Sequence, residues 1–272
     1  MTPSEINLDE LVCSVLSSRY THIDPTLVRR IVEDEVSKGH KPKEIIKAAR
    51  SKLHQVAVSY QEKPIPYVNF SDHLKTLPVD ISAPEMKDFC RQVLAYHAST
   101  AERLPVLEEF YGTIFKPLMP VNTLLDLACG LNPFTRPWMP LDKETVYLAG
   151  DIFSDLVGFV NLFFNHLEQK GRCEIIDLCG GFQLPPVDVA LLLKSVPCLE
   201  QLDKHLFPGL LGRIPAKHII ISFPVQSLGG KQKGMLQYYR SHFDEMVKGL
   251  PFFINTHLFK TELVYTLSRI DK

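Results

Sequence analysis

The sequence predicts an α/β protein in which a mainly parallel β-sheet is covered by helices and preceded by a small helical domain. Two observations lead to this prediction. From Val121 onward, apolar runs of strand length recur, with helical segments between most of them, as in sheets of parallel strands joined by helices. Before about Phe115, apolar residues repeat at helical spacing instead. We therefore expect two domains, residues 1–82 and 83–272.

The N-terminal part carries signals for several helices. Asp24 followed by Pro25 opens one of them, because an Asp side chain caps a first turn and proline is favoured at the first helical position. Residues 61–84 are rich in proline and polar turns and are expected to form a linker. The expected helices cover residues 8–16, 24–36, 43–60 and 84–115.

Seven apolar runs predict the strands of the sheet. The last two are joined only by Lys260 and Thr261, which leaves no room for a helix, so we expect an antiparallel hairpin at the sheet edge. In chain order the runs are TLLDLA, TVYLAGD, CEIID, VDVALLLK, HIIISFPV, FFINTHLF and ELVYTLSRI.

Composition and charge narrow the possible classes of protein. The chain has 272 residues, is 45% hydrophobic and carries a net charge of -1, so it can bury a proper core and any nucleic-acid surface must be local. The six cysteines form no CxxC pair or Cys/His cluster, and we expect free buried thiols and no metal. The first residues are acidic, and no run approaches about 18 apolar residues, so we expect a cytoplasmic protein without a membrane partner.

A local basic surface is predicted on the third expected helix. Lys43, Lys47, Arg50 and His54 follow one another along one stripe, away from the apolar side of the helix. Such a stripe is either an ordinary solvated face or a surface that contacts nucleic-acid phosphates, and both alternatives stay open. The nearby basic residues that favour phosphate contact are Arg19, Arg29, Arg30 and Lys52.

Three carboxylates, Asp126, Asp151 and Asp177, lie at or just beyond the ends of the first three predicted strands. In an open α/β sheet, ligands bind at the carboxyl ends of the strands. A carboxylate after the second strand can accept both ribose hydroxyls, and a side chain after the third can accept an adenine amino group. This spacing predicts an adenosine ligand. As alternatives, Asp126 could cap the first turn or hold the loop through backbone hydrogen bonds, and Asp177 could belong to the turn DLCGG.

The loop after the first strand, within LLDLACGLNPF, is shaped differently from a dinucleotide-binding loop. It has one glycine, Gly130, where a pyrophosphate-binding loop carries three. Asn132 tolerates a positive φ, and Asn132 followed by Pro133 is also a cap and first-turn signal. We expect a tight turn around a ligand that is less anionic than a diphosphate.

Other candidates lie at the ends of the later strands. Lys194 ends a buried aliphatic strand, where an unpaired ammonium would be costly, so it needs a specific partner or ligand. Phe223, at the end of the next strand, either stacks on a flipped base or belongs to the core. The segment SLGGKQKGM, with Lys231 and Lys233, is either a flexible loop or an arm that closes on RNA phosphates.

The motif D-x-x-x-G from Asp126 to Gly130, followed by Asp151 and Asp177, is similar to the S-adenosylmethionine site of Rossmann-like seven-stranded class I methyltransferases. Together with further stretches, it resembles the aminoglycoside-resistance 16S rRNA guanine-N7 methyltransferases over essentially the whole chain. The stretches that carry this resemblance are TLVRRIV, AARSKLHQ, HASTAERL, DLACGLNPF, ISFPVQSLGGKQKGM and TELVYTLSR.

The resemblance implies an S-adenosylmethionine-dependent, monomeric enzyme that methylates N7 of a decoding-site guanine, nucleotide 1405 of 16S rRNA, in the assembled 30S subunit and so confers aminoglycoside resistance. It implies that Lys194 lies near the methyl-transfer site as the catalytic candidate. It also implies that Arg103 grips the methionine carboxylate, although its acidic sequence neighbours alone suggest a surface ion pair. The other cofactor-binding candidates are Asp126, Gly130, Asp151, Ile152, Asp177 and Leu178.

The resemblance also assigns the N-terminal helices to docking on rRNA, with Arg19 and Arg50 at or close to family contacts. Gln226 and Ala101 depart from residues that relatives carry, which concerns rRNA affinity more than cofactor binding. The RNA-binding candidates are Arg19, Arg29, Arg30, Lys43, Lys47, Arg50, Phe223, Lys231 and Lys233.

The sequence leaves two alternative functions open. One is another RNA or small-molecule methyltransferase on the same fold, and the other is a catalytically silent rRNA-binding factor. The chain has no obvious Ser/His/Asp or Cys/His set, which is expected for guanine N7 because its in-plane lone pair needs no general base. Alignment and desolvation of the reacting groups would then supply catalysis.

Overall fold

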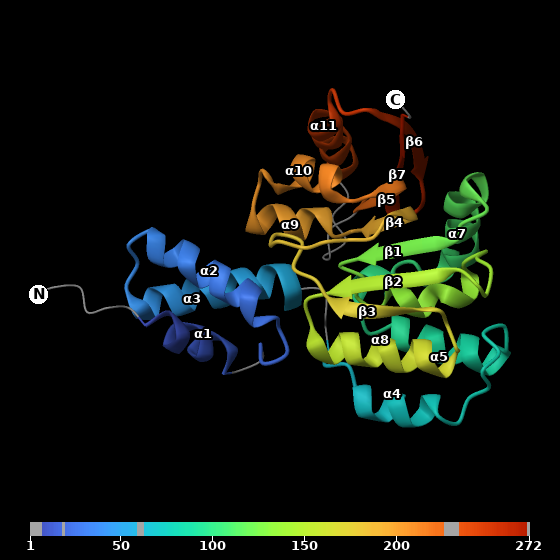
Figure 1. Cartoon of the computed structure of the whole chain (residues 1–272), viewed down its shortest axis with the longest axis horizontal. Coiled ribbons are helices and arrows are strands. Elements are labelled where there is room, and N and C mark those ends of the chain that lie inside the picture. The colour runs from blue at the N-terminus through green and yellow to red at the C-terminus, as the bar shows by residue number, and fades with distance from the viewer. Residues whose placement is uncertain (1–6, 18–19, 59–62, 226–233, 271–272) are drawn as a thin grey trace, which may run out of the picture.

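A computed structural model describes residues 7–17, 20–58, 63–225 and 234–270. A small helical domain lies beside the carboxyl ends of the first strands of a larger α/β domain (Figure 1). The sheet has seven strands in the order β3-β2-β1-β4-β5-β7-β6, in which β1 to β5 are parallel and β7 runs antiparallel to its neighbours β5 and β6. The strands are β1 (Thr123–Leu127), β2 (Val146–Asp151), β3 (Gly171–Ile175), β4 (Val187–Leu193), β5 (Ala216–Pro224), β6 (Phe252–Leu258) and β7 (Glu262–Arg269).

This sheet confirms the predicted α/β fold and the predicted edge hairpin. Each apolar run forms one strand. In β1, β4 and β7 the cause is burial, because a strand covered on both faces lacks polar alternation, whereas β3 and β6 are mostly exposed. The hairpin of β6 and β7 adds β7 between β5 and the edge strand β6.

Two hydrophobic cores cover the two faces of the sheet. Neighbouring β1 residues divide between them, since Leu124 belongs to one core and Leu125 to the other. The first core packs against α5 (Pro84–Leu94), α7 (Leu107–Phe115) and α8 (Ser154–His166). The second packs against α9 (Val196–Leu202), α10 (Leu206–Arg213) and α11 (Met235–Val247).

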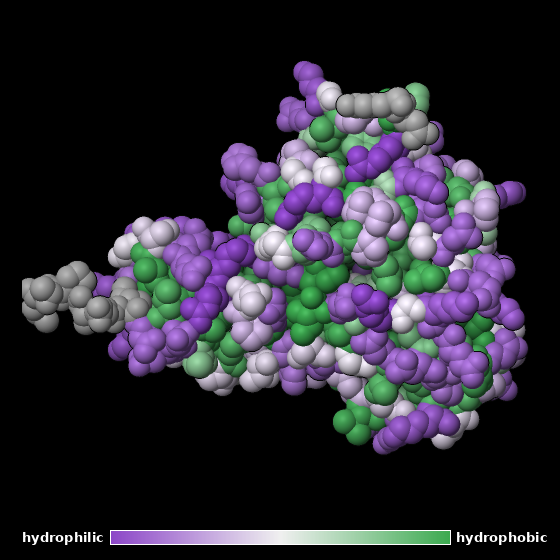
Figure 2. Space-filling view, viewed as in Figure 1, coloured by the Kyte–Doolittle hydropathy of each residue, from purple (hydrophilic) through white to green (hydrophobic). Residues whose placement is uncertain are grey.

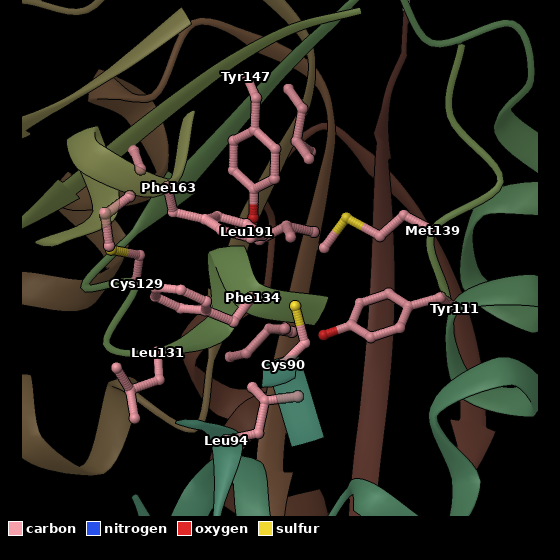
Figure 3. Close-up of a cluster of buried hydrophobic side chains, with 14 of the residues drawn as sticks. Cys90, Leu94, Tyr111, Cys129, Leu131, Phe134, Met139, Tyr147, Phe163 and Leu191 are labelled. Carbon is pink, nitrogen blue, oxygen red and sulfur yellow. The ribbon is translucent and has the colours of Figure 1, made fainter. Parts of the chain in front are cut away.

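The first core also supplies polar groups to the loop after β1. Tyr147 and Tyr111 extend into the cluster from different sides and direct their hydroxyls inward (Figure 3). The Tyr147 hydroxyl donates to Asp126 Oδ2 (2.8 Å), and that of Tyr111 donates to Asn132 Oδ1 (2.5 Å). Buried tyrosine hydroxyls need such partners, so the packing of this core also fixes the loop.

The helical domain has a hydrophobic core of its own. It consists of α1 (Leu8–Leu16), α2 (Pro25–Ser37) and α3 (Pro42–Leu53), which continues as the π-helical turn η1 (His54–Val58). The predicted cap of α2 is confirmed, because the Asp24 side chain accepts from Thr26 N at 3.0 Å.

The segment predicted to be a linker differs from that prediction. Residues 67–74 form α4 (Tyr67–Leu74), which packs against α8, and the ring of Phe70 stacks on that of Phe159 with centroids 6.1 Å apart. Ile65 and Leu74 join the first core of the α/β domain. The boundary between the two hydrophobic cores therefore lies between residues 53 and 65, earlier than the predicted boundary at residue 82.

The single helix predicted over residues 84–115 is also wrong. The chain forms α5, then the short α6 (Ala98–Ala101) and the 3-10 turn η2 (Leu104–Val106), and then α7. The Thr100 hydroxyl donates to the Leu94 carbonyl (2.6 Å) and closes the bend. This interruption directs residues 97–103 toward the carboxyl edge of the sheet.

Backbone contacts join the helical domain to the end of β2. The Asp24 N–H donates to the Ile152 carbonyl (2.9 Å), and the Ser154 N–H donates to the His22 carbonyl (2.8 Å). Ile23 and Phe153 form an antiparallel bridge between these bonds. The junction therefore lies next to the residues that follow Asp151.

Three further findings concern the general predictions. No helix in the described part of the chain is long and apolar enough to cross a membrane. Within the same residues, no group of three or more His, Cys, Asp or Glu side chains could hold a metal ion. All six cysteines are free, but only three are buried and Cys13 is exposed, so the prediction of buried thiols holds in part.

Candidate functional site

A cavity lies at the carboxyl edge of the sheet, where the two domains meet. It is lined by the ends of β1, β2 and β4, by the turn after β3 and by the segment of residues 97–103. The helical domain contributes Leu27 and Val56 to its wall. Of the predicted catalytic and cofactor-binding residues, the cavity is lined by Arg103, Asp126, Gly130, Asp151, Ile152, Asp177, Leu178 and Lys194.

Asp151 both lines the cavity and shapes its floor. Its Oδ2 accepts from Gly130 N (2.8 Å), while its Oδ1 accepts from Ile152 N (2.7 Å) and Phe153 N (3.4 Å). Burial raises the pKa of Asp151, and these backbone hydrogen bonds oppose that rise. Asp151 therefore fixes the loop after β1 relative to the end of β2, which is a structural role beyond the ligand contact predicted for it.

The loop after β1 turns tightly, as predicted, but Asn132 is not one of the residues that make the turn. Gly130 and Ala128 have φ values of 50°, whereas Asn132 is not among the residues with positive φ. Asn132 instead begins the 3-10 turn η4 (Asn132–Trp138), and its buried side chain donates to Asp126 Oδ2 at 2.8 Å. Asn132 is therefore a connecting residue beneath the loop.

Asp126 is buried beneath this loop, with only 1% of its surface exposed. Its Oδ2 accepts from Asn132 and Tyr147, while its Oδ1 has no hydrogen-bond partner among the described residues. Burial raises the pKa of Asp126 to about 7, against the lowering effect of these two hydrogen bonds. Asp126 thus holds the loop through side chains and not through the backbone hydrogen bonds of the sequence-based alternative, and Oδ1 remains available to a ligand.

Arg103 takes part in a buried ion pair instead of the surface pair that its neighbours suggest. Its Nε and Nη2 donate to the two carboxylate oxygens of Glu262 at 2.7 and 2.9 Å, and its Nη1 donates to Asn132 Oδ1 at 2.9 Å. Burial tends to lower the pKa of Arg103, but the Glu262 carboxylate outweighs this effect and raises it. Both side chains are at most 1% exposed, so neither charge has water as an alternative partner.

Lys194 has the specific partner that was predicted. Its ammonium donates to Glu102 Oε2 (2.6 Å) and lies 3.6 Å from Glu262 Oε1. Its backbone has a φ of 56°, which is uncommon for a residue other than glycine and concentrates at functional sites. The adjacent Ser195 hydroxyl is buried in the cavity wall without a partner among the described residues.

Asp177 lies two residues beyond β3 and is paired with a residue of the helical domain. Arg30 Nη2 donates to its Oδ2 (2.8 Å) and Oδ1 (3.1 Å), and Cys179 N donates to Oδ1 (2.9 Å). The turn predicted as an alternative role is therefore present, and the carboxylate also faces the cavity. Arg30 was predicted to contact RNA, but it is turned toward this carboxylate.

Sequence reasoning missed three residues of the site. Glu262 and Glu102 hold the two buried cations, and His97 lies against the loop at Gly130. Burial, together with the nearby charges of Lys194 and Arg103, lowers the pKa of His97 to about 4. The only signal for Glu262 was its place at the start of an otherwise apolar strand, where a charged residue needs a buried partner.

The predicted basic stripe is only partly free. Lys43 and Lys47 are exposed, and no acidic side chain of the described residues forms an ion pair with either. Arg29 pairs with Asp9, and Arg50 donates to the Ser14 carbonyl, which ties α3 to α1. Figure 2 shows hydrophilic side chains over much of the domain that carries α2 and α3.

Phe223 is wrong as an RNA-binding candidate, and three other candidates lie outside the described residues. Phe223 is fully buried in the second core, with its ring 5.0 Å from that of Tyr239, so it belongs to the core and is not available to a base. The segments that contain Arg19, Lys231 and Lys233 are not described.

The cavity suits an adenosine derivative that carries an amino-acid group. Carboxylates at the ends of β1, β2 and β3 offer acceptors for an ammonium, for hydroxyls and for an amino group. The unpartnered Oδ1 of Asp126 marks one position where a ligand donor would satisfy a buried acceptor. The loop holds one glycine and no cationic side chain that would receive a pyrophosphate, in agreement with the sequence-based prediction.

Comparisons with known proteins agree along almost the whole chain. Residues 16–266 match the family model described as ribosomal RNA methyltransferase (FmrO). A 16S rRNA (guanine(1405)-N(7))-methyltransferase of Micromonospora echinospora is 33% identical over 271 residues, covering 97% of this chain and 98% of that protein. An enzyme of the same name from Serratia marcescens is 31% identical, covering 97% and 99%.

The fold also matches solved structures. The crystal structure of the 16S rRNA methyltransferase RmtF in complex with S-adenosyl-L-homocysteine has a TM-score of 0.81 and 27% identity, covering 98% of this chain and all of that chain. The 16S rRNA methylase RmtB has a TM-score of 0.80 at 24% identity, which supports the fold alone.

Proposed function

This chain belongs to the FmrO family of ribosomal RNA methyltransferases, and from that premise we propose that it methylates N7 of guanine 1405 of 16S rRNA with S-adenosylmethionine as donor. The relatives that are 31 to 33% identical to it over nearly their whole length carry the name of this reaction. The structural observation that carries the proposal is the set of carboxylates at the ends of β1, β2 and β3, gathered around one cavity.

Each end of the cofactor has candidate contacts. Asp151 and Ile152 hold the ribose, Asp177 and Leu178 hold the adenine, and Asp126 Oδ1 receives the methionine ammonium. Arg103 faces the methionine carboxylate from beneath the loop, where Glu262 and Asn132 already fix its orientation. When bound, S-adenosylmethionine supplies an electrophilic methyl group on a sulfonium.

Lys194 positions the target base. Its ammonium has three donors, of which one donates to Glu102 Oε2 (2.6 Å) and a second to the Ser99 carbonyl (3.4 Å). Lysine is a common donor to guanine O6, so Lys194 holds the base while the N7 lone pair stays free. No side chain needs to remove a proton, and the buried charge network keeps water away from the reacting groups.

The substrate that fits the two-domain architecture is the assembled 30S subunit, and the reaction confers aminoglycoside resistance. Lys43 and Lys47 on the exposed face of α3 contact rRNA phosphates, which position the enzyme without specifying a sequence. We further propose that the protein acts in the cytoplasm, where ribosomal subunits lie, and that it acts as a monomer.

Methyl transfer from labelled S-adenosylmethionine to purified 30S subunits tests the proposal. We expect one methyl group per subunit, mapped to N7 of guanine 1405, and no labelling of protein-free 16S rRNA. Labelling at another position would identify a different RNA methyltransferase. Binding to 30S without any methyl transfer would identify a silent rRNA-binding factor.

A further inference from the structure

The N-terminal domain provides one wall of the cofactor cavity. Leu27 on α2 is fully buried in the cavity lining, and Arg30, three residues later, directs its guanidinium to Asp177. Residues three apart on a helix share a face. The helix therefore presents an apolar side chain to the cavity and a charged side chain to Asp177, which lines the cavity. Val56 on η1 adds a third contact from the same domain.

Arg30 determines how Asp177 is held. A single nitrogen of Arg30 reaches both carboxylate oxygens, and the Asp177 side chain is 10% exposed against 35% for Arg30. A carboxylate offers about four acceptor positions. Arg30 and the Cys179 N–H together occupy two acceptor positions on Oδ1, and Arg30 occupies one on Oδ2. One acceptor position on Oδ2 therefore stays open for a ligand donor. Without Arg30, only the Cys179 N–H would orient the carboxylate.

The same domain also fixes the residues beside Asp151. The Ile152 carbonyl accepts from Asp24 N, and Phe153 bridges to Ile23. The residues that follow β2 and the turn that follows β3 are therefore both attached to α2 or to the segment just before it. These two attachments lie at the ribose and adenine ends of the proposed cofactor site.

We propose that Arg30 is a positioning residue for the cofactor and that the N-terminal domain is a structural part of the cofactor site. This inference rests on the proposed function, because it takes Asp177 as the adenine contact. It makes cofactor binding and rRNA docking interdependent, since both use the placement of one small domain. By linkage, the cofactor changes 30S affinity by the same factor as 30S changes cofactor affinity.

The test is calorimetric titration of the full chain with two ligands. S-adenosylhomocysteine carries the adenine amino group, and S-inosylhomocysteine carries a carbonyl in its place. Arg30→Ala should lower the affinity for S-adenosylhomocysteine about tenfold, roughly the value of one charge-assisted hydrogen bond. The same variant should change the affinity for S-inosylhomocysteine less than twofold. Arg30→Lys keeps the charge and should recover most of the loss. Arg29→Ala, on the same helix but paired with Asp9, is the matched control and should bind as the wild type does.

The outcomes separate this inference from the proposed function. If the wild-type protein fails to bind S-adenosylhomocysteine, the proposed function is wrong. If the wild type binds and folded Arg30→Ala binds equally well, the positioning role is wrong. If Arg30→Ala lowers the affinity for both ligands equally, Arg30 is merely structural. If Arg30→Ala binds S-adenosylhomocysteine more tightly, Arg30 competes with the ligand for Asp177. Either result overturns the inference. If Arg30→Ala does not fold by thermal melting, Arg30→Gln, which keeps the first part of the side chain without the charge, decides between the same outcomes.

Discussion

Replacement of Asp126 by Asn should remove most of the pH dependence of cofactor binding between pH 6 and 7.5. Burial raises the pKa of Asp126 to about 7, and its Oδ1 lacks a partner among the described residues. An ammonium placed at Oδ1 favours the ionised carboxylate and so lowers this pKa in the complex. Binding must then expel the proton that the free enzyme carries at low pH. Affinity is therefore expected to rise as pH increases through about 7.

The size of the effect follows from the fraction of Asp126 that is ionised. With a pKa of about 7, roughly one molecule in eleven is ionised at pH 6 and about three in four at pH 7.5. Cofactor affinity should thus rise about eightfold over this interval, which corresponds to about 1.2 kcal/mol. The upper limit of this pH interval stays below about 7.7, the pH at which an α-amino group is half deprotonated. His97, whose pKa is lowered to about 4, stays neutral throughout.

Calorimetry at four pH values, in buffers of matched ionic strength, measures this slope. The Asp126→Asn variant should bind more weakly at pH 7.5 and show little change down to pH 6. A wild-type affinity that is flat over this range, or a variant that retains the full slope, would refute the assignment of the ammonium to Oδ1.

Stability without ligand provides an independent check. Because the folded pKa lies above the unfolded value of 3.8, the contribution of Asp126 to stability is fully present below about pH 4 and is lost as pH rises through about 7. A difference of about 3 units corresponds to on the order of 4 kcal/mol. The wild type should therefore lose stability relative to Asp126→Asn between pH 4 and 8, measured by urea unfolding.

Three further predictions concern the rest of the site and the RNA surface. Glu262→Gln leaves a buried guanidinium without its counterion and should lower the free energy of unfolding by about 3 kcal/mol; an unchanged urea midpoint would show that the pair is not buried in solution. Lys194→Ala should reduce methyl transfer at least about tenfold, as expected for a lost positioning contact, while 30S affinity in a filter assay changes little, and a parallel fall in both would make it a docking residue. The double reversal Lys47→Glu with Lys43→Glu should weaken 30S binding and reduce the slope of log affinity against log salt concentration by about 2, without affecting cofactor binding. The control is Lys116→Glu, which reverses an exposed lysine of the other domain. Full 30S affinity in the double variant would show that the stripe is an ordinary solvated face.

The sequence was most informative where a structure depends on local pattern. The strands follow from apolar runs, because a fully buried strand needs apolar residues along its whole length. The positions of Asp126 and Asp151 follow from the rule that ligands bind at the carboxyl ends of parallel strands. Both kinds of prediction need only the order of residues within one element.

Contacts between distant elements could not be predicted in this way. Arg103 looked like a surface residue because its neighbours in sequence are acidic, whereas its actual partner, Glu262, is 159 residues away. Arg30 looked like a neighbour of the basic stripe that contacts RNA, but its guanidinium is turned toward Asp177 at the domain junction. The segment before α5 looked like a linker because its prolines flank α4 closely, and only its packing on α8 stabilises that short helix.

The pairing of Arg103 with Glu262 has a consequence for the synthesis of the protein. Arg103 leaves the ribosome long before β7, whose first residue supplies its counterion. Until β7 has been made and has inserted between β5 and β6, the guanidinium must stay in water, and the segment that carries it cannot settle against the sheet. A newly made chain therefore completes its methyl-donor pocket only after β7 has joined the sheet. An rRNA methyltransferase of this family thus becomes able to bind its donor only after β7 has been translated.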